Sequence, residues 1–535
     1  MKTLNKITSL LTRLSNKNYF PISMRIFSLL LFILFIIALV LGSVKILTYD
    51  FTNKATMFIV WILWWPFLYI TLFFFARIWC GVLCPLSLAN QLGNMIHKGK
   101  GINYRKWAFV PFVLFFVIVY IEQTSGLFLS TSVTLWFFVL SFITAFVMGI
   151  LFLRFSFCKL ICPIGVILGV FSRISMIGLR TKKEICDKCP KKTCILGGRT
   201  NPCPVFLNVP AIKSNRDCLM CMNCIKNCPY DSAHIGVVSP GKEIMEKRDF
   251  ILSESYFIIC LLGLATVLTT NGTSLFRKIL TVFSITLSGS ILRLVDFVLG
   301  LGLFIIIFSV VGYVSAKSMN VKPKEFLSEL GYYYLPIVFF IMFYTISFGF
   351  LGPWLPISDG IISLIKYIFL IVGAIWSAYI IVKISLPKIN AKLARCAMIS
   401  FLLLIFTLFA GVLIQDPLNV VAQPDKTVFA HQGEVIHMES FSMGFDPNII
   451  VVEKGTEVVL FVDNIDIMHA FDLAEFDVHY VLFPAEKLEI RFTPDKTGEF
   501  EFTCSIPGHT EAGMKGKLIV VDVLTEDDET GFTVT

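Results

Sequence analysis

Eight of the fifteen cysteines fall between residues 186 and 229, which makes this segment the densest group of metal-binding side chains in the chain. Its second half has the spacing Cys218-x2-Cys221-x2-Cys224-x3-Cys228-Pro229. This is a ligand spacing for [4Fe–4S] clusters, because closely spaced cysteines let a short loop wrap one cube. Thiolates also suit iron–sulfur iron as soft ligands. The segment therefore predicts iron–sulfur chemistry.

The rest of the segment predicts how the cysteines divide. In two-cluster arrangements the fourth cysteine of a run binds the other cluster. This rule predicts two sets of four ligands. The first cysteine set comprises Cys186, Cys189, Cys194 and Cys228, and the second cysteine set comprises Cys203, Cys218, Cys221 and Cys224. Structural zinc is the alternative, but zinc sites usually combine two separated pairs and often a histidine. The compact run ending in Cys-Pro favours two [4Fe–4S] clusters.

Two further cysteine pairs form an internal repeat of the type CxxxCP. They are Cys80 with Cys84 before Pro85, and Cys158 with Cys162 before Pro163. Residues four apart on a helix share a face, so each pair is expected to present two thiols side by side. The four thiols (the CxxxCP set) are candidates for another metal or cluster, or for a dithiol or copper-handling site. The alternative is small structural residues at helix ends broken by proline.

The C-terminal part of the chain holds a third group of ligands, His469, Cys504, His509 and Met514. One cysteine, two histidines and one methionine are the ligands of a blue-copper electron-transfer site. Residues 425–523 alternate apolar and polar side chains between turn residues, which predicts a β-sandwich around these ligands. Position 508, where a binuclear copper centre has a second cysteine, is glycine. We therefore expect one mononuclear type 1 copper, with His479 as an alternative first ligand.

The composition places these groups in a membrane protein. Hydrophobic residues make up 56% of the 535 residues and charged residues 16%, against about 25% charged in soluble domains. This excludes a soluble globular enzyme, a disordered chain and a secreted disulfide scaffold. A bilayer span needs about 20 apolar residues. Nine candidate spans lie near 26–47, 55–76, 107–128, 133–153, 250–270, 290–314, 332–352, 361–383 and 396–415.

Charge predicts the orientation of these spans. Residues 421–535 contain 7 Lys/Arg and 22 Asp/Glu, whereas the preceding 420 residues contain 39 and 15. The basic residues cluster at alternate span ends, which follows the positive-inside rule rather than nucleic-acid binding. We expect a bacterial inner-membrane protein with a cytoplasmic N-terminus. The cysteine-rich segment is then cytoplasmic and the acidic tail is periplasmic or extracytoplasmic.

The predicted fold class is a polytopic α-helical membrane protein with two soluble parts. A small α+β bis-[4Fe–4S] ferredoxin-like insertion interrupts the spans, and an all-β cupredoxin sandwich follows them. The predicted domains are a four-span unit with the CxxxCP repeats, the ferredoxin-like domain, a five-span region and the cupredoxin domain. Their expected boundaries are 1–180, 181–249, 250–420 and 421–535.

These motifs together resemble a known family. Residues from about 20 to 250 resemble the NapH/NosR-type membrane polyferredoxins, with four spans, two CxxxCP motifs and two [4Fe–4S] motifs in that order. Residues 425–523 resemble single-copper cupredoxins. The resemblance implies quinol-linked electron delivery to exported respiratory reductases of denitrification, while a related branch handles copper for oxidase assembly. An N-terminal flavin domain found in NosR is absent from this sequence.

The leading hypothesis is an electron-transfer oxidoreductase component that connects quinol or cytoplasmic donors to the exported copper. The alternative is a copper reductase or assembly factor for cuproenzymes, and a third hypothesis is a redox sensor. No histidine lies between His234 and the end of the last span, so this chain alone cannot hold a bis-histidine haem in the bilayer. The remaining bridges across ~30 Å of hydrocarbon are a quinone, a centre at the CxxxCP set, or a haem subunit. The expected partners are membrane lipid, quinone, further membrane subunits and an exported redox protein or cuproenzyme.

Overall fold

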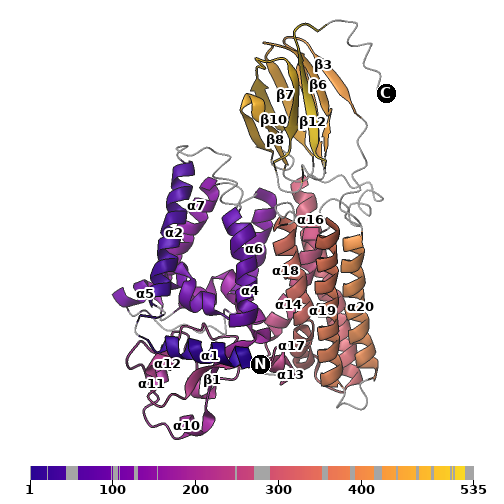
Figure 1. Ribbon diagram of the computed structural model, residues 1–535. Helices are drawn as coiled ribbons and strands as arrows, with labels where there is room; N and C mark the ends of the chain where they lie inside the picture. Colours follow the sequence, from indigo (N-terminus) through magenta and orange to yellow (C-terminus); the bar gives the residue numbers. More distant parts are fainter. Residues whose placement is uncertain are drawn as a thin grey trace.

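The computed structural model describes most of the chain. The described residues are 2–17, 19–20, 22–43, 58–97, 99, 107, 109–125, 131–152, 155–246, 250–269, 289–351, 359–385, 392–414, 425–441, 444–465, 469–482, 487–505, 509 and 513–524. Figure 1 shows three parts: long helices side by side, the cysteine-rich domain at one end of them, and a β-sandwich beyond the other end.

The long helices form two groups on either side of the cysteine-rich domain in the sequence. The first group contains α2 (Ile22–Ser43), the π-helix η1 (Phe58–Trp64) continuing into α4 (Trp65–Phe75), α6 (Val110–Ser125) and α7 (Thr131–Leu151). The second contains α14 (Leu252–Thr269), α16 (Gly289–Ser318), α17 (Pro323–Tyr333), α18 (Leu335–Leu351), α19 (Asp359–Ser385) and α20 (Lys392–Ile414). Each of the nine predicted spans overlaps one of these helices.

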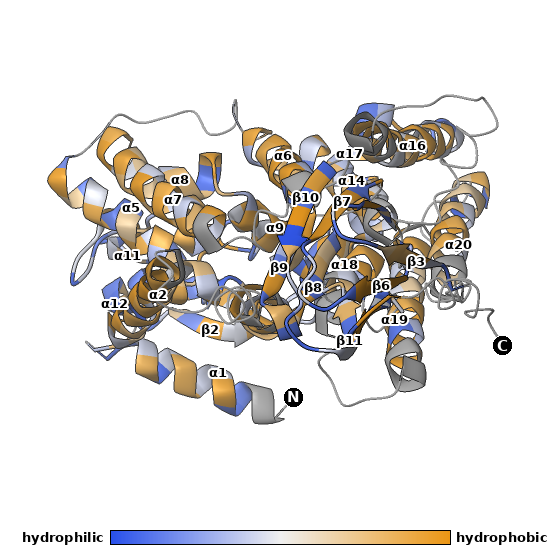
Figure 2. Cartoon of the chain, turned by 90° about the horizontal axis from the view of Figure 1, so that it is seen from above, coloured by the Kyte–Doolittle hydropathy of each residue, from blue (hydrophilic) through white to orange (hydrophobic). Residues whose placement is uncertain are grey.

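Fewer helices than the nine predicted spans are long and apolar enough to cross a membrane alone. Within the described residues, five helices are long and apolar enough to cross a membrane alone, or six when α17 and α18, bent by 46°, count as one span. The apolar helices of α4, α6 and α14 are shorter. The total of nine spans therefore stays a prediction. The outer helices expose large apolar side chains such as Ile306 and Ile375, and apolar residues dominate the helices in Figure 2, as a lipid-facing surface requires.

Aromatic side chains join the two helical groups. Tyr69 of α4 packs against Phe339 of α18, with ring centroids 5.7 Å apart. It also packs against Phe171, which itself lies 5.4 Å from Phe339. Aromatic pairs at such distances add to the stabilisation from buried area. The first four-helix unit and the second helical group therefore share one packed core.

Each of the two CxxxCP motifs lies where one short helix ends and the next begins. η2 (Trp79–Leu83) precedes α5 (Pro85–Ile96), and α8 (Ser156–Leu160) precedes α9 (Pro163–Phe171). Cys84 and Cys162 are extended N-cap residues, with ψ of 118° and 108°. The expectation of two thiols on one helical face was therefore wrong. Proline disfavours the helical conformation in the residue before it, so the second cysteine of each pair caps a new helix that proline begins.

The cysteine-rich domain has an α+β fold. β1 (Ile177–Thr181) pairs antiparallel with β2 (Ala233–Val237). The chain between these strands contains all eight clustered cysteines, from Cys186 to Cys228. The short helices of the domain are α10 (Lys183–Asp187), α11 (Thr193–Leu196), η4 (Val209–Ala211), α12 (Asn223–Asn227) and α13 (Lys242–Met245), with η3 (Ser172–Ile174) before β1. The N-terminal helix α1 (Lys2–Ser15) packs on β2, where Thr12 Oγ1 accepts a hydrogen bond from the Ile235 amide at 3.0 Å.

A buried ionic network connects this domain to the second helical group. Glu254 of α14 accepts hydrogen bonds from Arg216 and from the Tyr332 hydroxyl. Arg173 lies 3.7 Å from the same carboxylate and is completely buried. Its guanidinium also stacks over the Tyr332 ring. Because buried charges are tolerated only when they are paired, this network fixes α14 and α17 against the cysteine-rich domain.

The C-terminal domain is a sandwich of two sheets. The strands are β3 (Thr427–Ala430), β4 (Val435–Phe441), β5 (Gly444–Asp446), β6 (Ile449–Glu453), β7 (Val458–Asn464), β8 (His469–Leu473), β9 (Val478–Leu482), β10 (Lys487–Phe492), β11 (Gly498–Thr503) and β12 (Lys515–Val521), with the 3-10 turn η6 (Ala474–Phe476) after β8. One sheet has the order β10-β7-β4-β5 and the other β3-β6-β12-β11-β8-β9. Phe445, Phe471 and Phe502 fill the space between them.

Candidate metal centres

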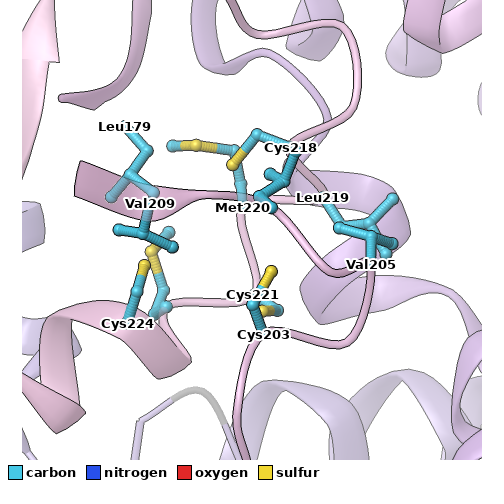
Figure 3. Close-up of a pocket in the computed structure, with 11 residues that line it drawn as sticks. Leu179, Cys203, Val205, Val209, Cys218, Leu219, Met220, Cys221 and Cys224 are labelled. Carbon is cyan, nitrogen blue, oxygen red and sulfur yellow. The ribbon is translucent and has the colours of Figure 1, made fainter. Parts of the chain in front are cut away.

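The four members of the second cysteine set line one pocket. Figure 3 shows Cys203, Cys218, Cys221 and Cys224 around a common space, with Val205, Val209 and Leu219 among the apolar walls. All four cysteines of this pocket are buried. The loop from Cys218 to Cys224 passes through left-handed conformations at Met220 and Met222. These turns let closely spaced cysteines face the same pocket.

The first cysteine set lines a second pocket. Cys186, Cys189, Cys194 and Cys228 surround it together with Pro210, Pro229 and Tyr230. Ser232 contacts two of these sulfurs, with its amide donating to Cys228 Sγ at 3.3 Å and its hydroxyl 3.1 Å from Cys186 Sγ. Burial, together with the neighbouring thiols of Cys228, Cys186 and Cys189, raises the pKa of Cys194 to about 11.

The helix α12 connects the two pockets. Cys224 lies on α12 and faces the second set, whereas Cys228 caps the same helix and faces the first set. The pKa of Cys224 is raised by burial and then by Cys221, Cys218, Cys203 and Cys194, the last of which belongs to the other pocket. The structure thus brings together the two sets of four that the spacing rule predicts, in adjacent pockets.

The spacing of the thiols bears on the zinc alternative. A zinc ion with Zn–S bonds of about 2.3 Å holds its thiolates within roughly twice that length of one another. In the described part of the chain, one group of three ligand atoms lies within 4.8 Å of one another, and it belongs to His469, Cys504 and His509. Neither cysteine set is that compact. A wider arrangement fits a polynuclear cluster, in which each thiolate binds a different iron atom.

The ligand atoms of the β-sandwich converge at one edge of the larger sheet. Cys504 Sγ lies 3.4 Å from His509 Nδ1 and 4.0 Å from His469 Nδ1, and the two imidazole nitrogens lie 3.1 Å apart. Cys504, His469 and Met514 are fully buried, and His509 is 8% exposed. A compact sulfur and imidazole triad with a methionine in the same loop fits copper, which accepts both ligand types.

Strand pairing explains how distant residues meet at this edge. Cys504 follows β11, and His469 begins β8, which pairs with β11 at Thr503. The loop back to β12 is closed by hydrogen bonds from the Cys504 amide to the Met514 carbonyl (3.1 Å) and from the Met514 amide to the His509 carbonyl (2.9 Å). The Ala470 amide donates to Cys504 Sγ at 3.2 Å. Hydrogen bonds to the cysteine sulfur tune the reduction potential of such sites.

Comparison with known proteins identifies two families along the chain. Residues 402–520 match the family described as "Cupredoxin-like domain". Residues 57–103 and 134–183 match, as two copies, the family described as "4Fe-4S binding domain". The chain is 26% identical over 216 residues to the electron transport protein YccM of Escherichia coli, covering 35% of this chain and 58% of YccM. It is 22% identical over 179 residues to the ferredoxin-type protein NapH of Escherichia coli, covering 29% of this chain and 60% of NapH.

The chain is a polyferredoxin fused to a cupredoxin domain. Cytochrome c oxidase subunit 2 of Thermus thermophilus is also similar, with 26% identity over 106 residues, 20% of this chain and 75% of that protein. The polyferredoxin part spans less than two thirds of YccM and of NapH. The matched domains suggest iron–sulfur and copper cofactors.

The two stretches matched as "4Fe-4S binding domain" contain the CxxxCP repeats of the polyferredoxin part and end before the first of the eight clustered cysteines, Cys186. One family matching twice supports the internal repeat that the sequence indicates. The structure also brings the two repeats together, because Arg77, three residues before Cys80, lies against Gly165, two residues after Pro163 of the second motif.

Several residues near the copper ligands carry no sequence motif. Asp472 accepts a hydrogen bond from the Ser505 amide at 3.1 Å and fixes the start of the copper-binding loop. His479, the alternative first ligand, lies on β9 with Nδ1 2.8 Å from Asp472 Oδ1, outside the compact triad. The pairing of β8 with β9 places these two residues opposite each other. Only the strand register reveals this contact, and the spacing of the two residues does not.

Proposed function

We propose that this protein carries electrons across the bacterial inner membrane, from a quinol or a cytoplasmic donor to an exported partner. The cysteine-rich domain would receive electrons on the cytoplasmic side, and the cupredoxin domain would deliver them outside. A quinol donor would release two electrons and two protons for each molecule oxidised. The partner would be a respiratory reductase of the denitrification type.

One observation carries this proposal: the two kinds of candidate site lie beyond opposite ends of the same helices (Figure 1). Two pockets with four cysteines each occur at one end, and the Cys504 and histidine triad occurs in the sandwich beyond the other. Such an arrangement serves little purpose for a carrier that works on one face of a membrane. It suits a protein that connects a donor and an acceptor in different compartments.

The residues around each site suit one-electron carriers. When bound, two [4Fe–4S] clusters and a type 1 copper supply one-electron redox chemistry. The apolar walls around the second cysteine set exclude water from its thiolates. The sandwich holds His469 and Cys504 on paired strands, so their positions depend little on whether a metal is oxidised or reduced. Rigid positioning of the ligands supports rapid transfer, because little rearrangement is needed.

The charge of the exported domain supports a basic partner. Residues 421–535 carry 22 acidic and 7 basic side chains. On the described surface the lysines of β10 and β12 already pair with acidic residues, as Lys487 does with Asp463 at 2.6 Å. The excess of unneutralised carboxylates would attract a positively charged protein surface and accelerate its encounter.

Copper handling is the second candidate function. It is favoured by the additional thiols of the CxxxCP set, since soft sulfur ligands select Cu(I). In that case the cysteine-rich domain would supply electrons to reduce Cu(II), and the exported domain would transfer Cu(I) to a cuproenzyme.

The experiment is anaerobic purification of the full chain, with iron and copper counted and EPR spectra recorded before and after adding a quinol. We expect a stoichiometric type 1 copper signal that disappears on quinol addition. Cys504→Ser should lose this signal and retain the iron–sulfur signals. Copper that stays oxidised while the clusters become reduced would contradict the proposal, and substoichiometric copper that washes out would favour copper handling.

A further inference from the structure

The first cysteine set lies nearer the protein surface than the second. Cys189, Cys194 and Cys228 are partly exposed, whereas all four cysteines of the second set are buried. The helices α10 and α11 each carry one ligand of the first set, and they lie at the end of the cysteine-rich domain away from the long helices (Figure 1). The loop of the second set instead packs against Gly81 of η2. A soluble protein can therefore approach the first set more closely than the second.

Two large apolar side chains are exposed next to ligands of the first set. Tyr230 lines the pocket of this set and is 46% exposed. Leu196 follows Cys194 by two residues and is 76% exposed. Single exposed apolar residues are ordinary on protein surfaces. Protein interfaces, however, combine an apolar and often aromatic centre with a polar rim, so the surroundings of these two residues decide what they indicate.

Basic side chains provide such a rim. Residues 182–199 contain six Lys/Arg and two Asp/Glu. The six are Lys182, Lys183, Lys188, Lys191, Lys192 and Arg199, and all of them are exposed. Within the part of the chain that the structure describes, none of the six forms an ion pair, whereas deeper in the domain Arg180 pairs with Glu243 at 3.0 Å. Their positive charge is therefore left for an acidic partner to neutralise.

Hydrogen bonds hold this surface in one conformation. The buried side chain of Asn227 accepts a hydrogen bond from the Thr200 amide at 2.8 Å and donates to the Thr200 and Asn201 carbonyls at 3.1 and 3.2 Å. The Asn227 carbonyl accepts a hydrogen bond from Thr193 Oγ1 at 2.5 Å. The loop that carries Leu196 is thus attached at both ends to α12, which connects the two cysteine pockets. A surface that is ordered before binding loses little conformational entropy when a partner binds.

The position of the basic residues disfavours lipid as the partner. Basic residues near span ends commonly follow the positive-inside rule. The basic residues that flank α10 and α11 instead lie at the end of the domain away from the long helices (Figure 1). A nucleic acid is also attracted to basic surfaces, but it carries no electron for a centre held by the adjacent cysteines. An acidic redox protein satisfies both the charge and the location.

We propose that this surface, the donor surface, binds a small acidic protein that carries one electron at a time. The donor surface consists of Lys188, Lys191, Lys192, Leu196, Arg199 and Tyr230. The carrier would be oxidised by one electron and the centre held by the first cysteine set would be reduced by one electron, with no bond formed and no proton moved. Opposite charges would accelerate the encounter. This inference rests on the proposed function and names its donor, which is a protein rather than a quinol.

The test is the binding of an acidic [2Fe–2S] ferredoxin to the full chain in nanodiscs, measured by biolayer interferometry without oxygen. We expect binding that weakens about tenfold or more between 0.1 M and 1 M salt, because the Debye length falls from ~10 Å to ~3 Å. Lys191→Glu/Arg199→Glu should weaken binding about tenfold or more at low salt, since it replaces attraction by repulsion. Leu196→Ala should weaken binding at both salt concentrations, because it removes an apolar contact.

Lys322→Glu/Lys324→Glu is the matched control. It makes the same change of net charge at two exposed lysines at the start of α17, outside the donor surface, and should bind ferredoxin like the native chain. Iron content and the EPR spectra report whether each variant is folded and loaded. Reduced ferredoxin, freed of chemical reductant, should be oxidised by the native chain in a stopped-flow experiment. The reaction should slow in Lys191→Glu/Arg199→Glu as its binding weakens.

Four results would overturn the inference. They are no ferredoxin binding by the native chain at low salt, equal binding of a basic cytochrome c, native binding by an iron-loaded Lys191→Glu/Arg199→Glu, and displacement of the ferredoxin by an equal concentration of a DNA duplex. Ferredoxin that binds to the donor surface while the copper stays oxidised would keep the docking site and contradict the electron-transfer function. Copper that quinol reduces in a native chain without ferredoxin binding would do the opposite.

Discussion

The contact between Gly81 and the loop of the second cysteine set gives the sharpest single prediction. Gly81→Ala would place a methyl group 2.1 Å from the Leu219 carbonyl oxygen and 2.7 Å from the Cys221 amide nitrogen. Comfortable contacts between such atoms begin above about 3.5 Å. Both obstacles are backbone atoms, so the loop cannot avoid the methyl group by a rotamer change. It must move by roughly 1 Å, and overpacking of this kind typically costs about 1–3 kcal/mol.

The movement would displace Cys221, a member of the second cysteine set. We expect Gly81→Ala to lose iron and to change the EPR signal of one cluster, while the type 1 copper signal of the distant sandwich stays the same. Gly302→Ala is the matched control, because a Cβ at Gly302 of α16 meets no atom within 4 Å. Native iron content and native EPR spectra in Gly81→Ala would refute the packing of η2 against this loop.

Three further predictions concern the network, the copper loop and the orientation. Glu254→Gln should leave Arg216 and Arg173 without their buried carboxylate and lower the free energy of unfolding by about 3–5 kcal/mol. Thermal unfolding in detergent should show a clearly lower midpoint. The control is Glu325→Gln, which changes an exposed ion pair, and an equally small change of midpoint in both variants would be inconsistent with the network. Asn464→Ala removes a buried hydrogen bond from Asn464 Nδ2 to the Leu482 carbonyl and should destabilise the sandwich by about 1–3 kcal/mol, measured by copper retention during chemical unfolding; unaltered retention would argue against this bond. A C-terminal epitope should be accessible to antibody in intact spheroplasts and an N-terminal epitope should not, and the reverse pattern would invert the proposed orientation.

Local patterns predicted much of the architecture. Each of the nine predicted apolar runs overlaps a helix that the structure describes, because burial in lipid requires about 20 apolar residues regardless of the neighbours. The alternation of apolar and polar side chains over residues 425–523 predicted a β-sandwich, and β10 is one of its strands; such alternation reports one buried face. The division of eight cysteines into two sets followed from short loop spacing, and the structure places Cys228 with the first set and Cys203 with the second.

Features that depend on tertiary contact were not predictable. The CxxxCP pairs do not share a helical face, because Pro85 and Pro163 start new helices and leave the preceding cysteines extended. Spacing could not show that the two motifs meet, nor that Arg77 lies between them. The Glu254 network joins residues from three distant segments, and no local pattern marks such a contact. The proline after each second cysteine was the one available signal for the break.

The central claim is that electrons pass from the cysteine-rich domain to the copper domain through one chain. The most direct measurement uses the full-length protein in sealed vesicles, with the membrane-impermeant reductant dithionite added only on the side of the cysteine-rich domain. The visible absorbance of the type 1 copper reports its oxidation state. We predict that the copper is reduced in the native protein and stays oxidised in Cys218→Ser/Cys221→Ser. Reduced clusters beside permanently oxidised copper in the native protein would contradict the claim.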